Sequence, residues 1–424
     1  MNLSDLLTRS FDAAVAAADP LRIVPTQLPE VPRGGRTLVV GAGKAAASMA
    51  RAVEDAWPPD QALSGRVITR YGHGLPTRRI EVIEAGHPVP DEAGESAALS
   101  ILEQAGALTE SDLLLALVSG GGSSLLSLPV ASVSMADLKA VTRSLLASGA
   151  PIQEMNIVRK HLSRIQGGRL AEATRARVCS LVISDVAGDD VSAIASGPCV
   201  PDPSTYADAI DVLGRWGVVA PASVATHLAR GAAGEIAETP KPGDALFERV
   251  QTRLIATAHR SLEAAATVFE RAGIRAVILG DSITGEARDV AQVMAALVRE
   301  IRAHGAPFAP PVALISGGEC TVTLRGGGRG GRCSEFLLAL HHALGDEATI
   351  HAIAADTDGI DGIESNAGAI VTPDTGRRAR ERGIDVRRLL DDNDAFSAFS
   401  ALGDLVVTGP TLTNVNDYRA ILIT

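Results

Sequence analysis

The segment TLVVGAGKAAASMARAV (residues 37–53) decides the fold, because an apolar strand runs through a glycine turn into an alanine-rich helix. The same alternation recurs through most of the chain. Strands such as LLLALVS (113–119) and VCSLVIS (178–184) are apolar on both faces. Strands of this kind lie in parallel sheets, between layers of helices. The sequence therefore predicts an α/β protein built on parallel sheets with helices on both faces.

Length and composition narrow the class of protein. A chain of 424 residues is long enough for two or three domains. The net charge of −11 argues against nucleic acid and anionic membranes as partners, and an aromatic content of 3% argues against base stacking. The N-terminal segment lacks a secretory pattern, and no run of about 18 apolar residues occurs. We expect a cytoplasmic protein without a membrane span.

A composition break near the middle of the chain predicts the domain boundary. The stretch GAAGEIAETPKPG (231–243) is rich in glycine, proline and glutamate and has no clear period. We assign residues 1–235 to a Rossmann-like N-terminal domain and residues 245–424 to a smaller C-terminal domain. In the latter, the apolar runs 312–315 and 321–324 flank the turn SGGE, which predicts a strand–turn–strand and a mixed sheet.

The glycine turn of the opening segment suits an anion. Gly41 and Gly43 let the backbone turn tightly before a helix whose N-terminus carries free N–H groups and a partial positive charge. Lys44 lies in this turn, although the chain uses arginine for almost all of its 39 basic residues. A retained lysine indicates a compact charge beside a phosphate. The alternative is a solvated lysine in the first turn of a helix.

The same turn also fits a dinucleotide fingerprint. Gly41, Gly43 and Ala46 match the pattern G-x-G-x-x-A. Arg70 stands where the acidic ribose ligand would end the second strand, which favours NADP over NAD. An NAD(P)H-dependent reductase is therefore the alternative to a phosphate-binding enzyme.

A second glycine cluster follows the next buried strand. In LVSGGGSSLLSLP (117–129), Ser119 is followed by Gly120, Gly121, Gly122 and Ser123. Consecutive glycines beside hydroxyls form a nest of donors for an anion, and the carboxyl end of a parallel strand is where α/β sheets bind ligands. The loop is no Walker A motif, because no lysine follows the glycines.

Positive charge gathers in NIVRKHLSRIQGGRLA (156–171), although the protein is acidic. Arg159 and Lys160 are candidates to bind a carboxylate or a phosphate. The alternative is a solvated helix face.

Carboxylates follow another strand in LVISDVAGDDVSAIASGP (181–198). Asp189 is a candidate Mg²⁺ ligand or general base, with an N-cap as the alternative. Ser196 and Gly197 then form a second tight turn, which we expect to contact a ligand.

The second half of the chain adds a glycine-rich segment, SGGECTVTLRGGGRGGRCSEF (316–336). Glu319 lies in its first turn, and Arg325 begins a loop that carries three arginines among glycines. Flexibility combined with positive charge is typical of a loop that closes over an anionic ligand.

Two further polar turns end strands in this half. Asp356 begins the acidic part of AADTDGIDGIESNAGAI (354–370). Asn414 lies in GPTLTNVND (409–417), a turn that either holds a ribose or base or caps the sheet.

Taken together, GAGKA, VSGGGSSL, NIVRKHLSRIQGGRLA, SDVAGDDVSAIASGP, SGGECTVTLRGGGRGGR, AADTDGIDG and GPTLTNVND closely resemble the glycerate 2-kinase family of the MOFRL type. The resemblance covers essentially the whole chain. It implies two α/β domains with the active site in the cleft, and ATP-dependent phosphorylation of D-glycerate to 2-phosphoglycerate with Mg²⁺. Members of this family have also carried the label hydroxypyruvate reductase, which matches the alternative above.

The resemblance also implies roles for single residues. Lys44, Asp189 and Arg325 match the catalytic lysine, acidic residue and arginine of the family motifs, and residues 119–123 match its phosphate loop. The substrate- or nucleotide-binding candidates are Gly43, Ser119, Gly120, Gly121, Gly122, Ser123, Arg159, Lys160, Ser196, Gly197, Glu319, Asp356 and Asn414.

These candidates permit a mechanism that leaves several points open. Lys44 and Arg325 would stabilise the transferring phosphoryl group, and Asp189 would orient or deprotonate the glycerate hydroxyl or hold Mg²⁺. The glycerate carboxylate would bind Arg159, Lys160 or Arg325. The sequence decides neither between a 2- and a 3-phosphate product nor the oligomeric state, for which a homodimer is one option.

Overall fold

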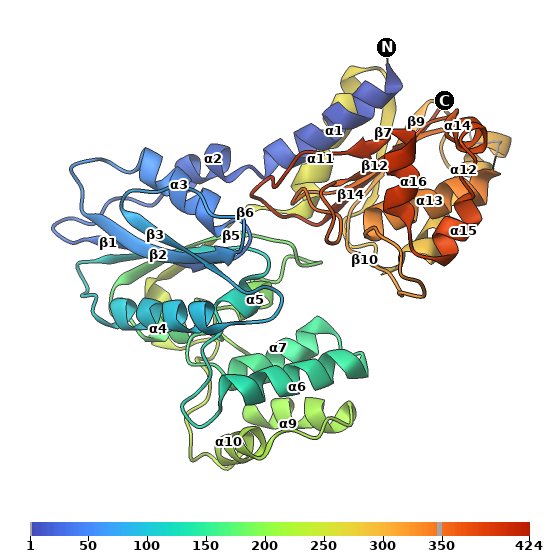
Figure 1. Cartoon of the computed structure of the whole chain (residues 1–424). Helices are drawn as coiled ribbons and strands as arrows, with labels where there is room; N and C mark the ends of the chain where they lie inside the picture. Colours follow the sequence, from blue (N-terminus) through green and yellow to red (C-terminus); the bar gives the residue numbers. More distant parts are fainter. Residues whose placement is uncertain (1, 346–349) are drawn as a thin grey trace. The chain divides into compact units, whose positions relative to one another are not determined.

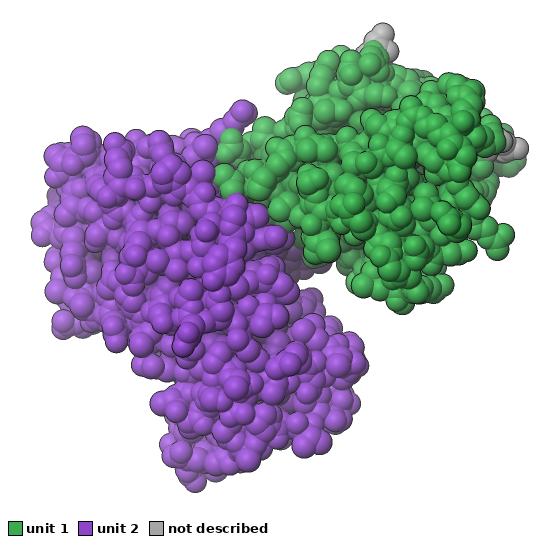
Figure 2. Space-filling view, viewed as in Figure 1, with its two compact units in different colours: residues 1–19, 256–424 green, residues 20–255 purple. Residues whose placement is uncertain are grey.

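The computed structural model describes residues 2–345 and 350–424, which form two compact units (Figure 2). Unit 2 spans Pro20–Ile255, and unit 1 combines Met1–Asp19 with Ala256–Thr424. Each unit is built on its own six-stranded sheet. The prediction of an α/β protein with two domains is therefore confirmed.

The sheet of unit 2 has the strand order β3-β2-β1-β4-β5-β6. Its strands are β1 (Thr37–Ala42), β2 (Leu63–Arg70), β3 (Ile80–Ala85), β4 (Leu113–Val118), β5 (Arg177–Ile183) and β6 (Val250–Ala256). Strands β1 to β5 pair in parallel, and β1 and β4 are buried along their whole lengths. Because β1 and β4 are neighbours in register, the turns that follow Ala42 and Val118 lie side by side.

Helices complete unit 2 in two groups. Those close to the sheet are α2 (Pro20–Ile23), η1 (Val24–Gln27), α3 (Ala46–Ala56), α4 (Glu92–Gly106), α5 (Gly122–Leu125), α8 (Arg169–Glu172), η2 (Ile194–Ser196) and η3 (Ala245–Arg249). A helical lobe consists of α6 (Met135–Ser148), α7 (Ile152–His161), α9 (Tyr206–Arg215) and α10 (Ala222–Ala232), which Figure 1 shows together below the sheet. The lobe has its own core, in which Val158, Tyr206 and Leu228 are buried.

The sheet of unit 1 has the order β13-β12-β11-β14-β9-β7. Its strands are β7 (Arg275–Gly280), β9 (Val312–Ser316), β11 (Ile350–Asp356), β12 (Gly368–Val371), β13 (Leu405–Val406) and β14 (Asp417–Ile423). The pair β7–β9 is parallel and the other pairs are antiparallel, so the sheet is mixed, as predicted. The helices are α1 (Leu3–Ala17), α11 (Ala258–Arg271), α12 (Ala287–His304), α13 (Arg332–Leu344), α14 (Thr375–Glu381), α15 (Val386–Asp391) and α16 (Ala395–Leu402).

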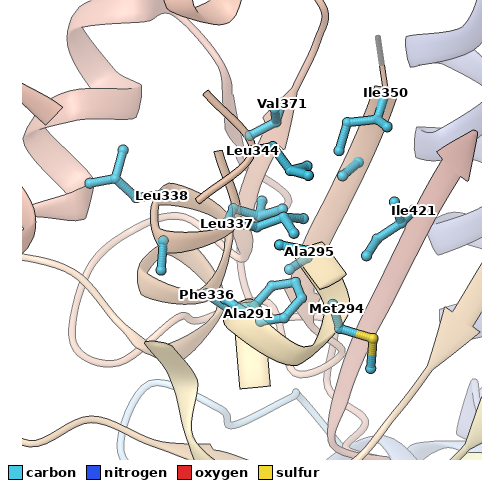
Figure 3. Close-up of a cluster of buried hydrophobic side chains, with 14 of the residues drawn as sticks. Ala291, Met294, Ala295, Phe336, Leu337, Leu338, Leu344, Ile350, Val371 and Ile421 are labelled. Atoms are coloured by element: carbon cyan, nitrogen blue, oxygen red, sulfur yellow. The ribbon is translucent and has the colours of Figure 1, made fainter. Parts of the chain in front are cut away.

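Alternate residues of the unit 1 strands enter different cores, as the two-residue period of a strand requires. On β14, Ile421 packs into one cluster with α12 and α13, while Leu422 packs into another with α1 and α11. Figure 3 shows the first cluster, in which Leu337, Ile350 and Ile421 converge with alanines and only one labelled aromatic ring. Aliphatic residues therefore make up most of this core, in line with the low aromatic content.

The compact units differ from the predicted domain boundaries at two places. The segment 2–19 packs with unit 1, because Leu6, Leu7 and Phe11 of α1 are buried in the same cluster as residues of α11. Strand β6 (Val250–Ala256) lies in the sheet of unit 2, although we had assigned residues from 245 onward to the second domain.

The predicted strand–turn–strand at 312–324 is wrong. Within the predicted second strand, 321–324, the only strand residue is Thr321, which belongs to β10 (Cys320–Thr321). Strand β10 pairs in parallel with β8 (Gly285–Glu286) in a separate two-stranded sheet. Leu324, which the prediction placed in a strand, is 78% exposed. None of the described helices has both the length and the apolar character that a membrane span needs.

Candidate active site

The loop after β4 presents backbone donors without acceptors. The N–H of Gly122 donates to the Ser119 carbonyl at 3.2 Å. In the part of the chain that the structure describes, the N–H groups of Gly120, Gly121 and Ser123 donate no hydrogen bond. Gly121 has a φ of 79°, which a residue with a side chain rarely adopts. Free N–H donors grouped within one short loop are suited to bind an anion.

Lys44 lies beside this loop because β1 and β4 are neighbours. Its backbone N–H donates to the Gly120 carbonyl at 2.8 Å. A Cβ atom placed on Gly121 would lie 3.5 Å from Lys44 Cγ and 2.9 Å from His87 Nε2. The structure therefore brings Lys44 to the glycine loop, as predicted, and adds His87, which no sequence motif indicated.

The turn after β1 differs, because its donors are already occupied. The N–H of Gly43 donates to the Ile68 carbonyl at 3.1 Å, and the N–H of Ala45 donates to Ser119 Oγ at 3.0 Å. A Cβ atom on Gly43 would overlap Ser119 Oγ, so this glycine permits close packing of the two turns. Ser119 is fully buried. Gly43 and the Ser119 hydroxyl, both candidates for phosphate binding, thus help to hold the two turns together.

Ser196 approaches the glycine loop from another turn. Ala195, Ser196 and Gly197 have φ values of 50°, 57° and 58°, a strained run for residues with side chains. The run is held by Gly167 and Gly168, whose N–H groups donate to the carbonyls of Ser196 and Gly197 at 2.9 and 2.8 Å. As a result, Ser196 Oγ lies 2.9 Å from Ser123 Oγ. Gly197 is a backbone partner in this arrangement.

The adjacent residues Arg159 and Lys160 have different environments. Arg159 Nη1 donates to Asn156 Oδ1 at 3.2 Å, and none of the described carboxylates lies within ion-pair distance of this guanidinium. Burial lowers the pKa of Arg159. The buried ammonium of Lys160 instead lies 3.4 Å from Asp202, whose carboxylate also accepts from Thr239. Arg159 is therefore available to an anionic ligand, whereas the ammonium of Lys160, the neighbouring candidate, lies in a buried ion pair with Asp202.

The carboxylates of the adjacent residues Asp189 and Asp190 also differ in their partners. Asp190 Oδ1 accepts the N–H of Ser192 at 2.9 Å and so stabilises its own turn. The Asp189 side chain has no hydrogen-bond or ion-pair partner among residues 2–345 and 350–424, and its backbone has a φ of 56°. Those residues also contain no group of three or more histidine, cysteine or acidic side chains arranged to hold a metal. Asp189 is therefore the carboxylate available to a ligand.

In unit 1, the glycine-rich loop 325–331 is anchored along its backbone, which corrects the expected flexible loop. The N–H groups of Arg325 and Gly326 donate to Asn393 Oδ1 at 2.7 and 3.2 Å. Those of Gly327 and Gly328 donate to Asp392, at 3.0 Å to its Oδ1 and at 2.9 Å to its carbonyl. The N–H of Arg329 donates to Asp394 Oδ1 at 3.1 Å. The glycines let the loop lie against this segment, since a Cβ atom on Gly328 would come within 2.5 Å of the Asp392 carbonyl oxygen.

The arginines of this segment have different partners. Arg332 forms ion pairs with Glu319, Asp356 and Asp417 at 3.2, 2.6 and 2.8 Å. Arg329 pairs with Glu364 and lies over the Phe396 ring. Arg325 is exposed and has no ion pair with any described residue. Glu319 and Asp356, two candidate nucleotide ligands, are thus both paired with Arg332, whereas Arg325 is available to a ligand.

The remaining polar turns contribute mainly to structure. Asn414 is buried, and its Oδ1 accepts the N–H of Asn416 at 3.3 Å, which favours the capping role over ribose binding. Asp361 accepts from the N–H groups of Cys333 and Ser334 at the start of α13, and burial raises its pKa to about 6.

Comparisons with known proteins identify the family. A family model described as a domain of unknown function, DUF4147, matches residues 6–229, and the MOFRL family model matches residues 312–417. A "Glycerate 2-kinase" of Pyrococcus horikoshii is 42% identical, with 100% of this chain and 98% of the relative covered. The crystal structure of a glycerate kinase from Thermotoga maritima has a TM-score of 0.88 at 38% identity, and covers 100% of this chain and 99% of its own.

A relative from Agrobacterium vitis bears the other name that the sequence suggested. It is called "Putative hydroxypyruvate reductase" and is 54% identical, with 99% of this chain and 94% of the relative covered. All of these proteins align over nearly their full length. The chain therefore belongs to the glycerate 2-kinase family of the MOFRL type.

Proposed function

We propose that the protein transfers the terminal phosphoryl group of ATP to the 2-hydroxyl of D-glycerate, giving 2-phosphoglycerate and ADP in the cytoplasm. The observation that carries this proposal is the set of free N–H donors at Gly120, Gly121 and Ser123 beside Lys44. Phosphoryl transfer needs positioning and charge neutralisation more than covalent help from the protein. Backbone donors and a lysine are suited to both tasks.

Lys44 supplies the charge that the backbone donors lack. A phosphoryl group in transfer spreads negative charge over its outer oxygens, and a fixed ammonium at that point stabilises the transition state more than the bound substrate. We assign Arg325 the same kind of task on the strength of its motif and its freedom from ion pairs.

Asp189 fits a magnesium ion bound largely by substrate. Mg²⁺ typically takes one or two carboxylates and completes its shell with phosphates and water. Asp189 has no partner among the described residues, and no described cluster of three ligands offers an all-protein cage. When bound, Mg²⁺ would neutralise charge on the phosphate oxygens. The other role proposed for Asp189 is that of general base. Its carboxylate would take the proton of the glycerate 2-hydroxyl as that oxygen attacks the terminal phosphorus of ATP and ADP leaves.

Arg159 suits the carboxylate of glycerate. Its side chain is half-buried, it lacks a described carboxylate partner, and it lies in the same hydrogen-bond network as the glycine loop. Partial desolvation of a cation without an anion is unfavourable, so a bound carboxylate would offset that cost.

The reductase alternative lacks a phosphate site in the place it requires. A dinucleotide fingerprint binds pyrophosphate through N–H groups at the start of the helix after β1. Those of Gly43, Lys44 and Ala45 already have acceptors within the protein.

One assay separates the two functions. We expect ADP release that depends on both D-glycerate and Mg²⁺, and no oxidation of NADH or NADPH with hydroxypyruvate. Phosphorus NMR of the product should show a 2-phosphate. Reduction of hydroxypyruvate without ATP turnover would overturn the proposal.

A further inference from the structure

A chain of side-chain hydrogen bonds runs inward from the glycine loop of unit 2. Ser123 Oγ lies 2.9 Å from Ser196 Oγ, which lies 3.2 Å from Asn156 Oδ1. Ser196 is fully buried and Asn156 is 3% exposed. Such a chain has a direction, because each hydroxyl has a single hydrogen to donate.

The direction is set at Asn156, whose amide can lie only one way round. Its Nδ2 donates to the Ala193 carbonyl at 3.2 Å, and its Oδ1 accepts from Arg159 Nη1 at 3.2 Å. The reversed amide would place its NH₂ group against the guanidinium and its oxygen against the carbonyl, which leaves two pairs of like groups in contact. Asn156 therefore presents an oxygen to Ser196.

The hydrogens of both serines are then assigned in turn. Ser196 donates its hydrogen to Asn156 Oδ1, so it can only accept from Ser123. Ser123 donates its hydrogen to Ser196 and keeps its lone pairs for a third group. A phosphate oxygen is an acceptor and cannot use those lone pairs, whereas a hydroxyl can donate to them.

We infer that Ser123 Oγ accepts a hydrogen bond from a hydroxyl group of the acid substrate, and that Ser196 and Asn156 are positioning residues that keep it an acceptor. This inference rests on the proposed function and deepens it. It also revises the expectation that the Ser123 hydroxyl binds phosphate. The phosphate is left to the N–H groups of Gly120, Gly121 and Ser123.

The same asparagine fixes a second recognition point. Asn156 Oδ1 accepts from both Ser196 and Arg159, so the hydroxyl acceptor and the half-buried guanidinium are held in one network. A hydroxyl acceptor and a carboxylate-binding guanidinium together select a hydroxy acid over an acid without the hydroxyl. Sites that hydrogen-bond a substrate hydroxyl discriminate strongly against analogues that lack it.

Binding measurements test this without relying on turnover. The probes are D-glycerate, D-lactate, which lacks the 3-hydroxyl, and 3-hydroxypropionate, which lacks the 2-hydroxyl, each titrated by calorimetry. The wild type should prefer D-glycerate to one of the analogues by about tenfold or more, and Ser123→Ala should reduce that preference to about twofold or less. Affinity for ATP should stay within about twofold of the wild type, since the hydroxyl does not contact phosphate.

Two further variants separate orientation from folding. Ser196→Ala should also reduce the preference, because Ser123 then loses its acceptor. Ser124→Ala is the matched control. The Ser124 hydroxyl donates to the Gly121 carbonyl at 3.1 Å and takes no part in the Ser123–Ser196–Asn156 hydrogen bonds, so the preference for D-glycerate should persist. Thermal unfolding midpoints establish that each variant is folded.

Three results would overturn the inference. In the first, Ser123→Ala loses affinity for ATP but keeps its preference for D-glycerate. In the second, the preference is unchanged in both Ser123→Ala and Ser196→Ala, and in the third, the wild type does not bind D-glycerate. Failure of the proposed function has a different signature. Selective binding of D-glycerate without ADP release would contradict the proposed kinase activity but not the proposed role of Ser123.

Discussion

Two glycine-rich loops of similar composition differ in the state of their backbone donors. In the loop 119–123 of unit 2, three N–H groups have no acceptor among the described residues. In the loop 325–331 of unit 1, five successive N–H groups bond to the segment 392–394. Glycine in the first loop leaves room for a ligand, and glycine in the second leaves room for another part of the same chain.

This difference shows that glycine content does not by itself identify an anion site. The turn after β1 makes the same point, because its fingerprint-like glycines bring N–H groups to acceptors within the protein. Buried backbone donors almost always have partners, so the N–H of the buried Gly120, with those of the half-buried Gly121 and Ser123 beside it, is the informative observation. We therefore expect substitutions in the loop 119–123 to affect catalysis, and those in the loop 325–331 to affect stability first.

Loss of the lysine beside the loop 119–123 should have the largest effect. Lys44→Ala removes the cation that neutralises the phosphoryl group, and we expect kcat to fall by about 10³-fold with an unchanged melting temperature. Lys139→Ala, on α6, is the matched control and should retain full activity. An active Lys44→Ala variant would remove the lysine from the mechanism.

A pair of glycine substitutions tests the two loops directly. At Gly121, φ is 79° and a Cβ atom would lie 2.9 Å from His87 Nε2, so Gly121→Ala should displace the donors and lower kcat/KM by about 10²-fold. At Gly327 a Cβ atom meets nothing within 4 Å, and Gly327→Ala should be close to wild type. Equal losses in steady-state kinetics would erase the distinction between the loops.

Asn393 tests whether the loop 325–331 is held as the structure indicates. Asn393→Ala leaves the N–H groups of Arg325 and Gly326 without their acceptor, which should lower the free energy of unfolding by about 1–3 kcal/mol. Chemical denaturation measures this loss. Asp391→Asn, at an exposed neighbour, serves as the control. A fully stable Asn393→Ala protein would mean that the loop needs no anchor.

A smaller effect is expected at Gly328. A Cβ atom there would lie 2.5 Å from the Asp392 carbonyl oxygen, so Gly328→Ala should cost about 1 kcal/mol of stability through displacement of the loop. KM for ATP should not change. A change in KM for ATP without any loss of stability would instead place this loop at the nucleotide.

The fold was largely predictable from the sequence because its signals are local. The strands β1, β4 and β5 are continuous apolar runs, and the glycine turns follow them directly. The placement of α1 was not predictable, since its apolar face specifies a buried helix but not α11 as its partner.

The candidate site was only partly predictable for the same reason. Arg159 and Lys160 are adjacent in the sequence, yet only Lys160 meets a carboxylate, on Asp202. Nothing local to Arg325 shows that Asn393 holds its N–H group. Asn156 stands first in a motif chosen for its positive charge, and its role became visible only through the groups that contact its amide.

The central claim is that the phosphates of the nucleotide bind the backbone of the loop 119–123. The most direct test follows backbone amide resonances in ¹⁵N-labelled protein while ATP and Mg²⁺ are added. We expect large shifts for Gly120, Gly121 and Ser123, with little change for Gly326, Gly327 and Gly328. Stationary resonances in the loop 119–123, with shifts confined to the turn after β1, would contradict it.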